Sequence, residues 1–167
     1  MKRGLILISL IFFIVGSCGD KKEISETTDE QNDRPKTAIT AKAIENFNYA
    51  DYALSSNAEP IMENWEKYQE LAIQVDYLKK ADLSFFNGDK ELLKKFISEF
   101  KEKIPDTLKT NPIVSRTIII ETTLLKLNEN LSLDNINEDV KLESVKEVVV
   151  AFSNLNYQIN KKIVDDI

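Results

Sequence analysis

Four stretches between residues 60 and 163 repeat large apolar residues every three or four positions, which is the spacing along one face of an α-helix. The chain holds only 4 glycines and 4 prolines, so little interrupts these patterns. The expected helices cover residues 60–86, 89–104, 112–131 and 139–163. Because the connections between them are short, residues 59–167 are predicted to form an all-α, up-down four-helix bundle.

Trp65 and Tyr68 lie on the apolar stripe of the first expected helix. Aromatic residues at helical spacing usually belong to a core, and that is the favoured interpretation here. An exposed pair would instead mark a partner or ligand surface, so both residues are also candidate site residues.

Residues 43–58 precede the bundle and carry too many apolar side chains for a free linker. Ile44, Phe47 and Leu54 follow helical spacing only loosely, and Ser55 then interrupts them. We expect a short helix or a capping arm, and the sequence leaves open whether it packs on the bundle.

Residues 18–42 are rich in charged and small polar side chains, with Ile24 and Ile39 as the only large apolar residues. A segment of this composition buries too little surface to offset the entropy lost on ordering. It is therefore predicted to be a disordered tether.

Residues 1–17 have the features of an export signal, because Lys2 and Arg3 come first and the apolar run Leu5–Val15 follows. That run is shorter than the roughly 20 residues that a membrane-spanning helix needs. The only cysteine of the chain, Cys18, comes directly after this segment.

Val15, Gly16, Ser17 and Cys18 resemble the lipobox of bacterial lipoprotein precursors, in which an aliphatic residue and two small residues precede a cysteine. The resemblance implies that residues 1–17 are a signal peptide, removed after a diacylglycerol is attached to the Cys18 sulfur. It also implies an N-acyl chain, such as palmitate, on the new N-terminus. From the residues alone, ordinary secretory cleavage, an uncleaved anchor and a buried cysteine remain alternatives.

The chain is acidic, with a net charge of −6. Removal of residues 1–17 takes away Lys2 and Arg3 and none of the 28 acidic residues, which makes the charge −8. Such a chain gains nothing from phosphate-rich partners, so nucleic acid is not an expected partner. The sequence has no basic cluster for direct binding to anionic lipid, so contact with a membrane would depend on the lipid at Cys18.

The chain contains no histidine. This excludes Ser-His-Asp and Cys-His nucleophile activation, histidine-ligated zinc and the histidine-containing di-iron sites of helical bundles. Two carboxylates near apolar stripes, Asp82 and Glu121, are expected to reach solvent or a lysine rather than to act as catalytic acids. We therefore expect no catalytic residue, no metal and no cofactor apart from the lipid at Cys18.

These patterns predict a bacterial cell-envelope protein that is lipid-anchored on the periplasmic or cell-surface side of a membrane. The expected function is a non-catalytic protein-interaction or scaffold module, with another envelope protein as its partner. One alternative is a carrier of a small apolar ligand, which needs a cavity of several hundred Å³ in the bundle core. Another is a cell-wall hydrolase that uses carboxylates alone, which needs two acids in one cleft.

Overall fold

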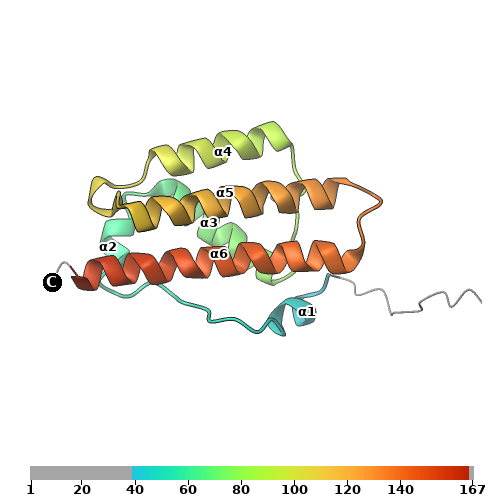
Figure 1. Ribbon diagram of the computed structural model, residues 1–167, viewed down its shortest axis with the longest axis horizontal. Coiled ribbons are helices and arrows are strands. Elements are labelled where there is room, and N and C mark those ends of the chain that lie inside the picture. The colour runs from blue at the N-terminus through green and yellow to red at the C-terminus, as the bar shows by residue number, and fades with distance from the viewer. Residues whose placement is uncertain (1–38, 166–167) are drawn as a thin grey trace, which may run out of the picture. The chain divides into compact units, whose positions relative to one another are not determined.

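The computed structural model describes residues 39–165, and these residues form helices but no strand. The long helices are α3 (Glu66–Lys79), α4 (Lys90–Glu102), α5 (Asn111–Ser132) and α6 (Glu138–Asp165). The short ones are α1 (Ala41–Glu45), α2 (Glu59–Met62) and the 3-10 helix η1 (Asp106–Leu108). Figure 1 shows that successive long helices run in alternating directions. The predicted all-α helical bundle is confirmed.

The core is centred on α5 and α6, which share the most extensive helix–helix contact in the described part of the chain. Their buried apolar residues include Ile113, Ile120, Leu124, Leu127, Val145, Val148, Val149, Leu155 and Ile159. These residues belong to the third and fourth apolar stripes of the sequence, so local periodicity correctly predicted the inward faces of both helices.

The first predicted helix, residues 60–86, is wrong in its length, because the chain forms two helices there. α2 ends at Met62, and Trp65 has φ −112° and ψ 72°, which are not helical values. This break directs the Trp65 indole towards α4, where Nε1 donates a hydrogen bond of 2.9 Å to the Phe100 carbonyl. That carbonyl is one of the last four of α4, which lack partners within the helix.

The end of α3 also comes earlier than predicted, because Ala81 adopts a left-handed conformation with φ 65°. The Asp82 amide donates to the Tyr77 carbonyl at 3.0 Å, as in the cap that commonly follows a left-handed residue. The chain then leaves the helix, yet Phe86 is fully buried. Apolar spacing therefore continues past the end of the helix, which explains the prediction of a longer one.

The start of α4 follows from the Asp89 side chain, which caps the helix. Asp89 Oδ1 accepts hydrogen bonds from the amides of Glu91 at 2.7 Å and Leu92 at 3.0 Å. The buried face of α4 consists of Leu93, Phe96, Ile97 and Phe100. Leu92, an apolar residue of the predicted helix 89–104, is 69% exposed, because it lies about 100° around the helix from Leu93, at the edge of this buried face.

The segment before α2 packs on the bundle. Thr40 Oγ1 accepts a hydrogen bond from the Ala43 amide at 3.1 Å and caps α1, which starts at Ala41. The tether boundary predicted at residue 42 is therefore too late. Residues 46–58, called the arm below, continue as an irregular chain that hydrogen-bonds to α6 (Figure 1). The segment is thus a helix of 5 residues followed by an arm.

Candidate functional site

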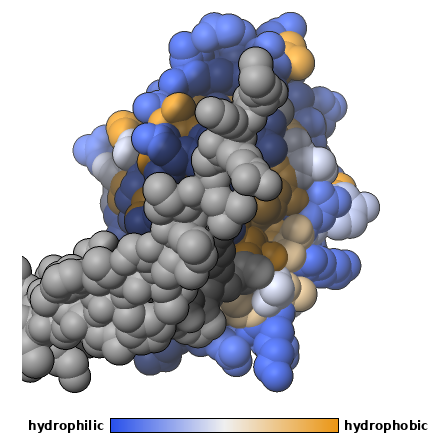
Figure 2. Space-filling model, turned by 90° about the vertical axis from the view of Figure 1, so that its right-hand side faces the viewer, coloured by the Kyte–Doolittle hydropathy of each residue, from blue (hydrophilic) through white to orange (hydrophobic). Residues whose placement is uncertain are grey.

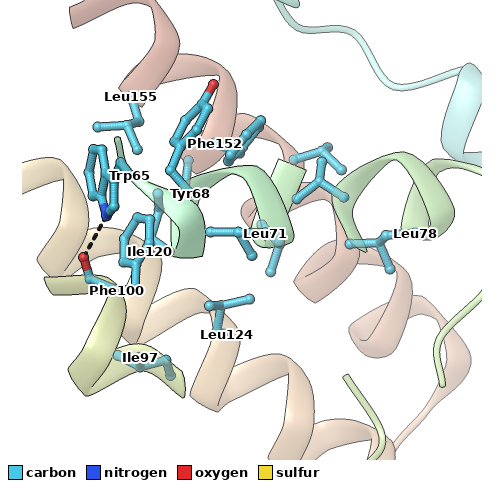
Figure 3. Packing of buried hydrophobic residues seen from close by; sticks show 14 of the residues in the cluster. Trp65, Tyr68, Leu71, Leu78, Ile97, Phe100, Ile120, Leu124, Phe152 and Leu155 are labelled. Carbon is cyan, nitrogen blue, oxygen red and sulfur yellow. Dashed lines mark hydrogen bonds between the residues drawn. The ribbon is translucent and has the colours of Figure 1, made fainter. Parts of the chain in front are cut away.

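The two aromatic candidates, Trp65 and Tyr68, belong to the core, with exposed fractions of 0% and 4%. The Trp65 ring stacks on Phe100 with centroids 4.8 Å apart, and the Tyr68 ring stacks on Phe152 at 5.4 Å. Figure 3 shows both rings pointing into the space between the helices. Their interpretation as a partner or ligand surface is therefore wrong, and the favoured interpretation as core residues is confirmed.

Tyr68 also begins a chain of hydrogen bonds that crosses the bundle. Its hydroxyl donates to Asn156 Oδ1 at 2.7 Å, and Asn156 Nδ2 donates to the Tyr52 carbonyl in the arm at 2.9 Å. Both polar side chains are buried, so these partners offset the loss of hydrogen bonds to water. α3, α6 and the arm are thereby joined through one pair of side chains.

Three polar side chains of α6 hold the arm, and Ser153, Asn156 and Asn160 are together called the α6 row below. Ser153 Oγ accepts a hydrogen bond from the Tyr52 amide at 2.8 Å and donates one to the Ala50 carbonyl at 2.6 Å. The hydroxyl therefore satisfies a donor and an acceptor of the arm's backbone at the same time.

Asn160, two helical turns after Ser153, likewise satisfies a donor and an acceptor of the arm's backbone. Its Oδ1 accepts from the Ser55 amide at 2.8 Å, and its Nδ2 donates to the Ala53 carbonyl at 2.8 Å. The α6 row thus recognises the backbone of the arm rather than its side chains. Sequence reasoning missed these residues, because polar side chains at i, i+3 and i+7 are ordinary on an amphipathic helix.

Burial raises the pKa of the Tyr68 hydroxyl far above its usual value of 10.0, and the negative charge of Asp76 raises it further. In the unfolded chain Tyr68 loses its proton near pH 10, whereas in the folded chain it keeps the proton. Its contribution to stability is therefore complete below about pH 10 and is lost as the pH rises above that value.

The substitution Tyr68→Phe is expected to reduce the loss of stability at alkaline pH, because phenylalanine has no proton to release. The measurement is urea unfolding of the wild type and the variant at a series of pH values above about 9. Below that range the variant should be less stable by about 1 kcal/mol, since the hydrogen bond to Asn156 is gone. An identical alkaline slope for both proteins would contradict this account.

A surface groove of about 380 Å³ lies between α3 and α4. Its apolar lining comes from Phe85, Leu92, Leu93 and Phe96. Three of its charged residues form ion pairs, because Lys67 Nζ lies 2.7 Å from Glu70 Oε2 and 3.4 Å from Glu99 Oε2. The groove therefore offers apolar contact without a strong charge of either sign.

Asn128 of α5 fixes the loop beside this groove. Its side chain is buried, and Nδ2 donates to the carbonyls of Phe86 and Gly88 at 2.9 Å each. Gly88 itself lines the groove. A buried asparagine on an apolar helix face is thus used to position the connection between α3 and α4, and this residue was also missed from the sequence.

A second groove, of about 440 Å³, lies among α1, the arm and the end of α3. Lys79 Nζ pairs with Asp51 Oδ2 at 2.7 Å there, and burial raises the pKa of the neighbouring Tyr49 hydroxyl. Charged and aromatic side chains line it together, and it is open to solvent. Neither groove is an enclosed cavity of the bundle core.

The carboxylates singled out in the sequence lie at the surface. Asp82 is exposed, and hydrogen bonds from the Ser84 hydroxyl and amide lower the pKa of its carboxyl group, which is opposite to the shift that a general acid needs. Glu121 pairs with Lys101 across α4 and α5. Glu102 lines the same shallow groove as Glu121 and accepts a hydrogen bond from the Ser98 hydroxyl. Glu121 and Glu102 are therefore held by ordinary surface interactions, of the kind that contribute little to stability.

Within residues 39–165, no group of three or more His, Cys, Asp or Glu side chains is placed to hold a metal ion. Within the same range, no helix combines the length and the apolar character needed to span a membrane. Hydrophilic residues cover much of the described surface that Figure 2 shows, with hydrophobic residues scattered between them.

The predicted lipid-attachment residue Cys18 and the lipobox residues Val15, Gly16 and Ser17 lie outside the described residues. The same is true of the predicted tether up to residue 38. These assignments therefore stay predictions from the sequence.

Comparison with known proteins gives no relative for this chain. No family model, no curated protein and no solved structure matches it.

Proposed function

We propose that this chain is a bacterial lipoprotein, held on a cell-envelope membrane by lipid at Cys18, whose helical bundle is a non-catalytic protein-interaction module. The observation that carries the anchor is the position of the only cysteine, directly after an apolar run and two small residues. A diacylglycerol together with an N-acyl chain anchors a protein stably, whereas a single acyl chain does not.

The use of buried polar groups supports a structural role for the bundle. Trp65 Nε1, the Tyr68 hydroxyl and the Asn128 amide all bond to another segment of the chain. Buried polar groups that serve catalysis are instead directed at a place where a substrate can bind. These groups join helices, loop and arm, so they support a scaffold rather than an enzyme.

The groove between α3 and α4 is the surface that we propose for the partner. Leu92 beside it is 69% exposed, which is the largest exposed fraction among the large apolar residues of the described range. Two lysines, Lys67 and Lys95, and three acids, Glu70, Asp89 and Glu99, line the groove, so its formal charge is only −1. A partner with an apolar side chain at the centre of its contact surface, rather than a strongly basic one, fits this lining.

Photo-crosslinking in living cells tests the proposal. A photoreactive amino acid replaces Leu92 in one variant and Asn154, an exposed residue of α6, in the matched control. We expect Leu92 to capture an envelope protein in the membrane fraction, and the added substitution Cys18→Ser to remove that adduct. Equal adducts from both positions would contradict the proposed surface. Recovery of a bound small apolar molecule in place of a protein would favour the carrier alternative.

A further inference from the structure

The arm is attached to α6 by side chains alone. Ser153, Asn156 and Asn160 of the α6 row make five hydrogen bonds to backbone groups of the arm, and each uses a side-chain atom of the row. The backbone–backbone hydrogen bonds of the arm stay close in sequence, such as that from the Ala58 amide to the Ser55 carbonyl at 2.9 Å. Opening the arm therefore breaks no backbone ladder and leaves the hydrogen bonds within α6 intact.

The apolar attachment of this region is also weaker than that of the bundle. Ile44 of α1 and the small side chain of Ala58 at the end of the arm are buried, but Phe47, Tyr49 and Leu54 are only partly buried. The largest fully buried side chains of the described chain all lie at or after Trp65. The ion pair between Asp51 and Lys79 is solvent-exposed and adds little. Regions with few buried apolar contacts are the ones that open locally before a protein unfolds.

We propose that α1 and the arm form a strap, which opens from α6 as a unit while α3 to α6 stay folded. Opening frees residues 39–58, a stretch that spans about 25 Å as a flexible coil and at most about 70 Å when fully extended. Opening of the strap thus lengthens the stretch of chain between residue 39 and α2. Its use in extending the bundle away from a membrane rests on the proposed function, whereas the opening itself does not.

The α6 row stays ready to rebind the arm after opening. Asn156 Oδ1 remains bonded to the Tyr68 hydroxyl from within the core, so Asn156 Nδ2 keeps pointing towards the site of the arm. Because the row contacts backbone groups, rebinding does not need a particular side chain at residues 50, 52, 53 or 55. Reclosure is therefore local and reversible.

Hydrogen exchange of the full chain, followed by mass spectrometry, tests the strap. In the wild type, the amides of Tyr52 and Ser55 should exchange at least about a hundredfold faster than the core amides of α5, since local opening exposes only the former. Exchange of both groups at one slow rate would mean that the arm opens only with global unfolding. That result would overturn the proposal.

The substitution Asn160→Ala sharpens the test, because it removes both contacts to the arm from a partly exposed position and leaves the core intact. It should speed exchange at Ser55 by about tenfold and leave α5 unchanged. Asn154→Ala, an exposed neighbour on the same helix, is the matched control and should change neither rate. An equal acceleration at Ser55 and in α5, or no acceleration at Ser55, would overturn the strap.

The strap test is independent of the anchor. The exchange pattern should be the same in the wild type and in the variant Cys18→Ser, because residue 18 lies outside the bundle and the arm. If the variant Cys18→Ser leaves the membrane but keeps the exchange pattern, the strap proposal is supported. If the exchange pattern does not show local opening but attachment depends on Cys18, the anchor proposal is still supported. The two proposals therefore fail separately.

Discussion

Replacing Trp65 with alanine is expected to lower the free energy of unfolding by about 3–5 kcal/mol, the usual cost of removing a buried aromatic ring. The indole is 0% exposed, stacks on Phe100 and donates to the Phe100 carbonyl at 2.9 Å. The variant therefore gains a cavity and leaves a buried carbonyl without its donor. Natural domains are stable by only about 5–15 kcal/mol, so this loss is a large share of the total.

Two further variants separate the contributions of Trp65. Trp65→Phe keeps a ring but loses the N–H donor, so it should cost about 1–3 kcal/mol. Ile73→Ala, at a position of α3 that is 53% exposed, should change stability by no more than about 0.5 kcal/mol. Urea unfolding followed by far-ultraviolet circular dichroism is the measurement, because Trp65 is the only tryptophan. Equal losses for Trp65→Ala and Ile73→Ala would show that the indole does not join α3 to α4.

Replacing Cys18 with serine is expected to move the protein from the membrane fraction to the soluble fraction. Each buried CH₂ of an acyl chain contributes about 0.8 kcal/mol to membrane binding, so a diacylglycerol and an N-acyl chain make release negligible. The acidic chain supplies no comparable attraction to anionic lipid. Loss of the single sulfur should therefore remove the attachment that the lipid provides, and any protein that stays on the membrane should still carry residues 1–17.

The control for this experiment is Ser17→Ala, which keeps a small residue before Cys18 and should leave the protein on the membrane. Mass analysis of the mature N-terminus is the second measurement, because an unprocessed signal peptide can also hold a chain at a membrane. We expect the wild type to begin at a lipid-modified Cys18. A mature wild-type chain whose first residue carries no lipid would refute the anchor.

The break before α3 illustrates the limit of periodicity. The apolar stripe through residues 61, 65, 68, 72, 75 and 78 is continuous in the sequence, so one helix was predicted across it. In the structure Trp65 leaves the helical conformation, and its indole reaches α4 at Phe100, 35 positions away. This hydrogen bond can form only when α4 is packed beside Trp65, because its acceptor is a carbonyl of α4. The spacing of apolar residues in the sequence therefore cannot predict the break at Trp65.

The α6 row illustrates the same limit for polar residues. Ser153, Asn156 and Asn160 look like ordinary polar positions of an amphipathic helix, and Ser153 meets the Tyr52 amide across 101 positions of sequence. Nothing near α6 in the sequence indicates that an extended segment lies against it. Conversely, the stretch of the arm from Ala50 to Ser55 has no regular pattern, and side chains of α6 bond to its backbone groups.

The sequence by itself determined the helical class of the fold and the buried faces of α5 and α6, because a period of 3.6 residues is a local property of the chain. It also predicted the Asp89 start of α4, since a capping side chain acts on its own next turn. Only the tertiary structure decided that Trp65 and Tyr68 are enclosed, that the first helix divides, and that the arm lies on α6. Each of these features depends on contacts between residues that are distant in the sequence, and such contacts stabilise the structure only after folding has brought the segments together.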